Sequence, residues 1–174
     1  MVIIDIFAEK LYAVKYAGDI LDIYNKCIES WTDVEYVRGF VKEHQSDIKD
    51  KDINQVVEEI IEDAEDIDDL LNELSQSTHE NIDEFFAPLR NSEYKVQLLS
   101  KQKGRIYRDS FTRIYAIKIE SNCFVITGGA IKFTRFMDEH KHTEQELKNI
   151  NKVRDYLMDN QVIDKDTFQD LDLK

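Results

Sequence analysis

The sequence predicts one α+β domain, in which a strand, several helices, an antiparallel sheet and a last helix follow one another. Three observations predict this class. A heptad pattern marks a long helix near residues 53–75, β-favouring residues dominate 112–136, and a helical pattern opens after residue 143. The 174 residues fit a single domain, 1–174, that carries an acidic helical insertion at about 50–76.

The N-terminal segment, 2–16, is rich in β-favouring side chains and predicts one extended strand that stops before Gly18. Apolar residues at three- and four-residue steps then predict a helix that ends near Trp31. Thr32 and Glu35 form a capping-box pattern, so a second helix is expected to open there.

The long helix over 53–75 has apolar residues at alternating steps of four and three, which form a heptad seam from Ile53 to Leu74. From Asp50 to Glu73 there are 11 carboxylates, and Lys51 is the one basic residue among them. Three alternatives stay open: the seam packs on the domain, it forms a dimer, or the acidic helix covers a basic site.

The C-terminal half predicts two pairs of strands and a helix. Residues 94–108 are expected to form an extended pair with its turn at 101–104. Strands at 112–119 and 123–134 are expected to meet in a hairpin with Asn122 at the turn.

Two local patterns add detail to this half. Gly128-Gly129 within a strand predicts a bulge or the close approach of another backbone. Thr143 and Glu146 form a second capping-box pattern, which predicts the start of the last helix.

Charge is distributed unevenly along the chain. The formal net charge is −13, yet residues 93–137 hold nine basic and three acidic residues. An acidic protein is repelled by nucleic acid and anionic membranes, so a basic segment within it predicts a local site. No apolar run approaches the roughly 20 residues of a membrane span. We expect a cytoplasmic protein without membrane contact.

Chemical motifs are sparse. Cys27 and Cys123 lie far apart and are expected to be buried free thiols. The sequence lacks the glycine-rich nucleotide loops, the HExxH pattern and the GxSxG pattern, and no cofactor is expected. Glu139, His140 and His142 allow a metal site, a solvated loop or a histidine that acts as acid or base; we expect no metal.

The hairpin carries the candidate site. Strand alternation predicts that Arg113, Tyr115 and Lys132, with Arg135, share an open face of the sheet. The residues between them would face the core: Ile114, Ala116, Ile131 and Phe133. Arginine suits phosphate, lysine supplies a point charge, and tyrosine can stack, a combination that suits RNA. The alternative is a solvated face whose charges keep the sheet soluble.

Three stretches between about residues 87 and 158 resemble the RelE/ParE superfamily of small bacterial toxins, in its HigB-like and phage-derived branch. They read PLRNSEYKVQLLSKQKGRIYR, TRIYAIKIESNCFVITGGAIKFTR and HTEQELKNI. The matching positions are Pro88-Leu89, Tyr94–Leu98, Arg113, Tyr115, Ile117, Phe124–Thr127, Gly128, Lys132, Thr143 and Glu146.

The resemblance implies a RelE-like fold and a ribosome-dependent mRNA endoribonuclease of a toxin–antitoxin system, with an antitoxin protein, the ribosome and mRNA as partners. In such an enzyme the RNA 2′-hydroxyl attacks the adjacent phosphate and leaves a cyclic phosphate. Arg113 would then bind the phosphate, Lys132 would stabilise charge or transfer a proton, and Tyr115 would stack on a base or protonate the leaving group. His142 would act as acid or base. Further RNA contacts would come from Lys103, Arg108, Lys118 and Arg135.

A second interpretation is a non-catalytic relative from a mobile-element or defence locus, whose basic sheet binds a protein or nucleic acid. A third is an interaction protein that forms a homodimer through the 53–74 seam.

Overall fold

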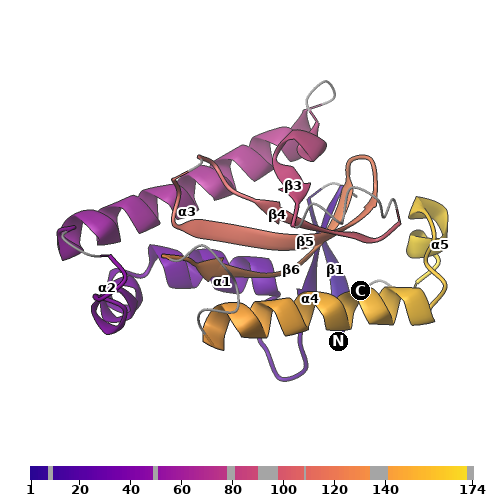
Figure 1. Ribbon diagram of the computed structural model, residues 1–174. Coiled ribbons are helices and arrows are strands. Elements are labelled where there is room, and N and C mark those ends of the chain that lie inside the picture. Colours follow the sequence, from indigo (N-terminus) through magenta and orange to yellow (C-terminus); the bar gives the residue numbers. More distant parts are fainter. Residues whose placement is uncertain are drawn as a thin grey trace.

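The computed structural model describes residues 1–7, 10–48, 51–77, 81–89, 98–107, 109–133 and 141–171 (Figure 1). Its strands are β1 (Val2–Phe7), β2 (Leu11–Lys15), β3 (Phe86–Pro88), β4 (Ser100–Gly104), β5 (Thr112–Glu120) and β6 (Cys123–Ile131). Its helices are α1 (Ile23–Thr32), α2 (Val34–Glu43), α3 (Ile53–Gln76), the 3-10 turn η1 (Ile82–Glu84), α4 (Lys141–Asp159) and α5 (Lys165–Gln169).

The strands form one sheet in the order β1-β2-β6-β5-β4-β3. Neighbours are antiparallel except β2 and β6, which pair in parallel, so the α+β class is confirmed but the sheet is mixed. The prediction of one N-terminal strand over 2–16 is wrong, because β1 and β2 pair antiparallel with each other within this segment.

The predicted hairpin is confirmed as β5 and β6, and Asn122 at its turn has the left-handed φ of 58°. The turn predicted at 101–104 is wrong, since β4 runs through these residues and pairs with β5. Leu99, the residue just before β4, has a left-handed backbone conformation with a φ of 49°.

Helices cover both faces of the sheet (Figure 1). One face presents Ile114 and Ala116 to a core shared with α1, α2 and α3. The other presents Tyr115 and Ile117 to a core shared with α4 and α5. A strand between two helical layers buries side chains that point to either face. Neither face of β5 is therefore open to solvent throughout, although Arg113 and Lys118 remain partly exposed.

The apolar seam of α3 packs into the chain's own core. Val57, Ile60, Ala64, Ile67 and Leu71 are at most 6% exposed. The interpretation in which the seam packs on the domain is therefore confirmed, and the same residues are not available for a coiled-coil dimer in this fold. The helix lies on the Ile114 face, opposite the face that carries Tyr115.

Both capping-box predictions are wrong. Thr32 ends α1, and Asp33 caps α2 by accepting the backbone N–H groups of Glu35 and Tyr36 at 2.8 and 3.0 Å. Helix α4 already includes Lys141, so the buried Thr143 lies within the helix instead of capping it.

Candidate nucleic-acid interface

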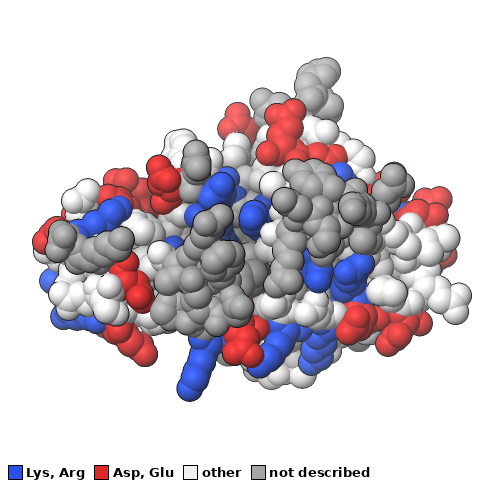
Figure 2. Space-filling view, in the orientation of Figure 1, with Lys and Arg blue, Asp and Glu red and all other residues white. Residues whose placement is uncertain are grey.

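Three basic side chains from β4, β5 and the loop between them lie near one end of the sheet. Lys103 pairs in register with Tyr115, Arg113 lies two residues before Tyr115, and Arg105 follows the end of β4. We call Lys103, Arg105 and Arg113 the basic end. In Figure 2, Lys and Arg side chains lie over the region of β4 and β5, and Asp and Glu side chains lie above and to the left of it.

The charges of the basic end raise one another's electrostatic energy. Burial lowers the pKa of Lys103, and the nearby Arg105 and Arg113 lower it further. Burial also lowers the pKa of Arg113, with Arg105 as the next cause. Asp63 and Asp109 oppose part of this effect at Arg113. A bound anion would offset the remaining repulsion and the lost hydration of the two half-buried cations.

Arg113 has a fixed direction. Its Nη1 atom donates hydrogen bonds to the carbonyl oxygens of Ser110 and, at 2.6 Å, of Thr112. The guanidinium group thus folds back on the segment that leads into β5, and the residue remains partly exposed. A planar fork of this kind matches the oxygens of a phosphate.

Tyr115 lies beneath α4 instead of on an open face. Its side chain is 1% exposed and packs in the core that α4 contributes to. Burial raises the pKa of its hydroxyl. The prediction that Tyr115 is open to RNA is therefore wrong, and a base cannot stack on this ring in the structure described.

Glu146 of α4 approaches the same face of the sheet. Its Oε1 accepts a hydrogen bond at 3.3 Å from Asn149. Its Oε2 is buried without a hydrogen-bond partner. Burial raises the pKa of this carboxyl to about 7, so it can hold or release a proton near neutral pH.

Gly128 and Gly129 give space to two side chains on opposite faces. A Cβ on Gly128 would overlap the carboxylate of Glu146, and one on Gly129 would meet the ring of Trp31. The predicted bulge is also confirmed, because Gly128 pairs with Tyr115 while Ile126 pairs with Ala116.

Lys118 lies on the other face of the sheet. Its ammonium group forms an ion pair with Asp83 of η1 at 2.5 Å and lies 5.6 Å from the ring centroid of Phe124. It pairs in register with Ser100, three residues before Lys103. The structure therefore does not bring Lys118 together with the basic end.

Lys132 and His142 lie where β6 ends and α4 begins. The backbone N–H of Lys132 donates to Phe111 at 2.8 Å, and Nε2 of His142 lies 3.0 Å from the carbonyl oxygen of Ile131. The His142 ring also meets edge-on the rings of Phe40, in α2, and of His44, which follows that helix. Ile131 pairs with Thr112 next to Arg113, so Lys132 follows β6 at the end of the sheet where β5 begins. The ring contacts of His142 lie on the α2 side of the sheet and do not place this residue with the basic end.

Four predicted candidates lie outside the described residues: Arg108, Arg135, Glu139 and His140. Within the described ranges, no group of three or more His, Cys, Asp or Glu side chains could hold a metal ion. Cys27 and Cys123 are buried free thiols, as predicted.

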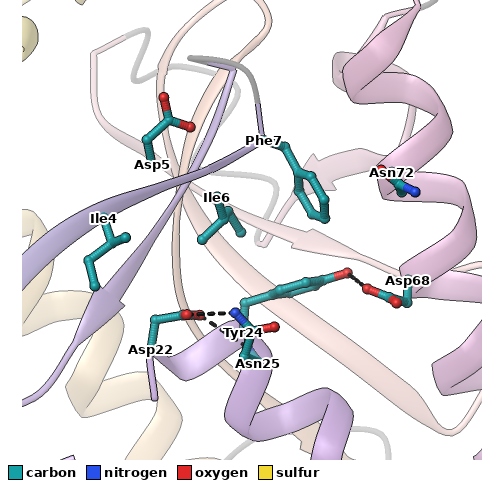
Figure 3. Close-up of a pocket in the computed structure, with 9 residues that line it drawn as sticks. All are labelled: Ile4, Asp5, Ile6, Phe7, Asp22, Tyr24, Asn25, Asp68 and Asn72. Atoms are coloured by element: carbon teal, nitrogen blue, oxygen red, sulfur yellow. Dashed lines mark hydrogen bonds between the residues drawn. The ribbon is translucent and has the colours of Figure 1, made fainter. Parts of the chain in front are cut away.

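A separate cavity of about 490 Å³ opens between β1, α1 and α3 (Figure 3). The Tyr24 hydroxyl donates to Asp68 at 2.6 Å, and Asp22 accepts from the side chain of Asn25 at 2.6 Å. The lining includes Asp5, Asp22 and Asp68 but no Lys, Arg or His among the described residues. This acidic cavity would repel an anionic ligand, so the basic end is the better candidate for RNA.

The sequence did not predict Glu146 as a site residue, because the capping-box pattern assigned it to the start of the last helix. A signal was present in Gly128-Gly129, which predicted a bulge or the close approach of another backbone; at Gly128 the group that approaches is the Glu146 side chain. The burial of Tyr115 also had a signal, since the consecutive apolar residues Tyr115, Ala116 and Ile117 indicate a strand covered on both faces.

In the part of the chain that the structure describes, no helix has the length and apolar character needed to span a membrane. Comparison of the chain with protein-family models, curated proteins and solved structures found no match, so the interpretation of the site rests on its own residues.

Proposed function

We propose that the protein binds RNA through phosphate groups at the basic end and acts as a RelE-like, ribosome-dependent mRNA endoribonuclease. The observation that carries the proposal is the mutual proximity of Lys103, Arg105 and Arg113, the first and last of them half-buried. RNA supplies the closely spaced negative charges that such a cluster favours. Lys132 follows β6 at this end of the sheet and can stabilise charge, and His142, next to the carbonyl group of Ile131, can move a proton.

The order of elements supports the same proposal. The RelE-like resemblance implies an N-terminal strand, two helices, an antiparallel run of strands and a last helix. The chain has this order, with β1 paired outside β2 and α3 inserted before β3 as additions. The matching position Arg113 lies on β5, and Lys132 directly follows β6, the strand that pairs with it.

The proposed reaction moves one proton off the RNA and one onto it. The 2′-hydroxyl loses its proton to a base, its oxygen bonds to phosphorus, and the bond from phosphorus to the 5′-oxygen breaks as that oxygen gains a proton. Arg113 and Lys132 stabilise the negative charge that develops on the phosphorane. His142 is the proposed proton carrier, because an imidazole can serve as base and acid near neutral pH.

A second candidate is an RNA-binding protein without nuclease activity. The burial of Tyr115 favours it, since this residue has a catalytic role in the resemblance but lies beneath α4. Both candidates require the basic end, and they differ in whether RNA is cut.

Expression in bacterial cells tests the proposal. The wild-type protein should arrest growth and produce new mRNA ends within translated regions, whereas Arg113→Gln should do neither. Lys148→Gln removes an exposed positive charge from α4 and should behave like wild type. Normal growth and intact mRNA with the wild-type protein would reject the endoribonuclease and leave the binding function to be tested in vitro.

A further inference from the structure

We infer that Asp63, on the acidic helix α3, is a positioning residue that holds Arg113 in the direction required to bind a phosphate. The inference rests on the proposed RNA-binding function of the basic end. It also assigns a role at that site to the helix inserted between the N-terminal helices and the strands β3 to β6.

Asp63 reaches from α3 to the segment that leads into β5. Its Oδ2 accepts the backbone N–H of Phe111 at 2.6 Å and that of Thr112 at 3.4 Å. Two consecutive residues, Phe111 and Thr112, are therefore attached to one acidic side chain.

The segment 110–112 also holds Arg113, through its carbonyl groups. Its guanidinium group donates to the carbonyl oxygens of Ser110 and Thr112. Asp63 binds the N–H side of the segment and Arg113 binds its C=O side, so a shift of the segment would redirect the guanidinium group. This chain of contacts links α3 to the basic end through the segment 110–112.

Asp63 is more deeply buried than its acidic neighbours on α3. It is 9% exposed, whereas its neighbours Glu62, Glu65 and Asp66 are exposed to solvent. Burying a carboxylate is costly, and the hydrogen bonds from Phe111 and Thr112 offset part of that cost. Its burial raises its pKa, which these hydrogen bonds oppose.

If Asp63 acted only through its charge, its removal would change RNA affinity in the direction opposite to the one that the positioning role predicts. Asp63 also borders a cavity of about 240 Å³ that is lined by Glu59, Glu62, Asp66 and Asp109. Removal of one negative charge near a basic site should tighten RNA binding if charge alone matters. The positioning role predicts weaker binding, so the sign of the change separates the two accounts.

The experiment measures the affinity of a fluorescently labelled single-stranded RNA by anisotropy at fixed low salt. Asp63→Ala should weaken binding about tenfold, the equivalent of one hydrogen bond to a charged group. Asp63→Asn retains an acceptor oxygen and should restore most of the affinity. Asp66→Ala, the matched control, removes an exposed charge from the same helix and should bind RNA at least as tightly as wild type. In an Arg113→Gln background, Asp63→Ala should cause no further loss.

Two additional measurements keep the test decisive. Asp63→Glu keeps the charge but lengthens the side chain, and it should weaken binding in the same direction if Asp63→Ala does not fold. The NMR signal of the Arg113 side-chain Nε–H reports the order of the guanidinium group without RNA, and Asp63→Ala should change it while Asp66→Ala should not.

RNA binding by Asp63→Ala as tight as wild type, or an equal loss in the Arg113→Gln background, would overturn the inference. If the wild-type protein binds no RNA, the proposed function fails. In that case an unchanged Arg113 signal in Asp63→Ala would overturn the positioning role as well, and a changed signal would support it independently.

Discussion

The carboxylate of Glu146 occupies the space above Gly128 that any other residue at that position would fill with its side chain. Glycine in a strand lacks a side chain to pack, and here a helix supplies the missing contact. The pair fixes where α4 lies on the sheet, and it buries an ionisable group beside Tyr115 and Tyr16.

Gly128→Ala should destabilise the protein. The added Cβ would overlap Glu146 and force the helix or the strand to shift, at a cost of about 1–3 kcal/mol. Urea unfolding measures the change. Gly39→Ala is the matched control, because Gly39 is exposed within α2 and a Cβ added there would have nothing within 4 Å. That substitution should stabilise the protein by about 0.5–1 kcal/mol. Equal effects at the two positions would contradict the packing account.

Stability should fall as pH rises through the titration of Glu146. Its pKa is about 7 in the folded protein, above the ordinary value of 4.5, so the folded state holds the proton more tightly than the unfolded state. The associated stability is fully present below about pH 4.5 and is lost by about pH 7, a total on the order of 3 kcal/mol.

Urea unfolding of wild type and Glu146→Gln at pH 5 and pH 8 measures this dependence. The difference between the two proteins should change with pH in favour of the glutamine variant at pH 8. Glu144→Gln serves as a control, because Glu144 is exposed and its pKa is lowered by Lys148. A wild-type protein whose stability changes with pH in the same way as that of Glu146→Gln would refute the assignment.

Lys103→Gln and Lys118→Gln should differ in their effect on RNA affinity, although each substitution removes one positive charge. Lys103→Gln should weaken RNA binding, since Lys103 belongs to the basic end. Lys118→Gln should leave the affinity unchanged and lower the unfolding free energy by about 0.5–1 kcal/mol through loss of the ion pair with Asp83. Anisotropy and urea unfolding measure the two effects; an equal loss of RNA affinity in both variants would show that position on the sheet does not matter.

Tyr115→Phe should retain the growth arrest proposed for the wild-type protein. The phenylalanine ring keeps the packing beneath α4, and the buried hydroxyl has no access to a bound RNA in the structure described. Growth curves with the variant at matched expression provide the measurement. Loss of the arrest in a folded Tyr115→Phe protein would mean that α4 moves away to expose this residue.

Local patterns predicted the elements whose contacts lie close in sequence. The seam of α3 predicted its buried face, and Asn122 marked the turn between β5 and β6. The pairing of β2 with β6 joins residues more than 100 positions apart, and no local pattern of Leu11–Lys15 specifies that partner. Alternation placed Arg113 and Tyr115 on one face, but only the packing of α4 decides that this face is covered.

The candidate site was predicted only in part, because some of its contacts join residues that lie far apart in the sequence. Strand alternation identified Arg113 and charge alone identified Lys103, and the strand register then placed them near each other. Lys118 was assigned to the site by charge alone, although its position in the strand places it on the opposite face. Asp63 was one carboxylate among many in the acidic helix, and only its contact with 110–112 separates it from the others.

The salt dependence of RNA affinity tests the central claim most directly. RNA binding should weaken linearly on a logarithmic plot as salt rises, and Arg113→Gln should reduce the magnitude of the slope by about one while lowering the affinity at every salt concentration. Lys148→Gln should leave both quantities as in wild type. An Arg113→Gln protein with the affinity and slope of wild type would contradict the claim that the basic end binds RNA phosphate.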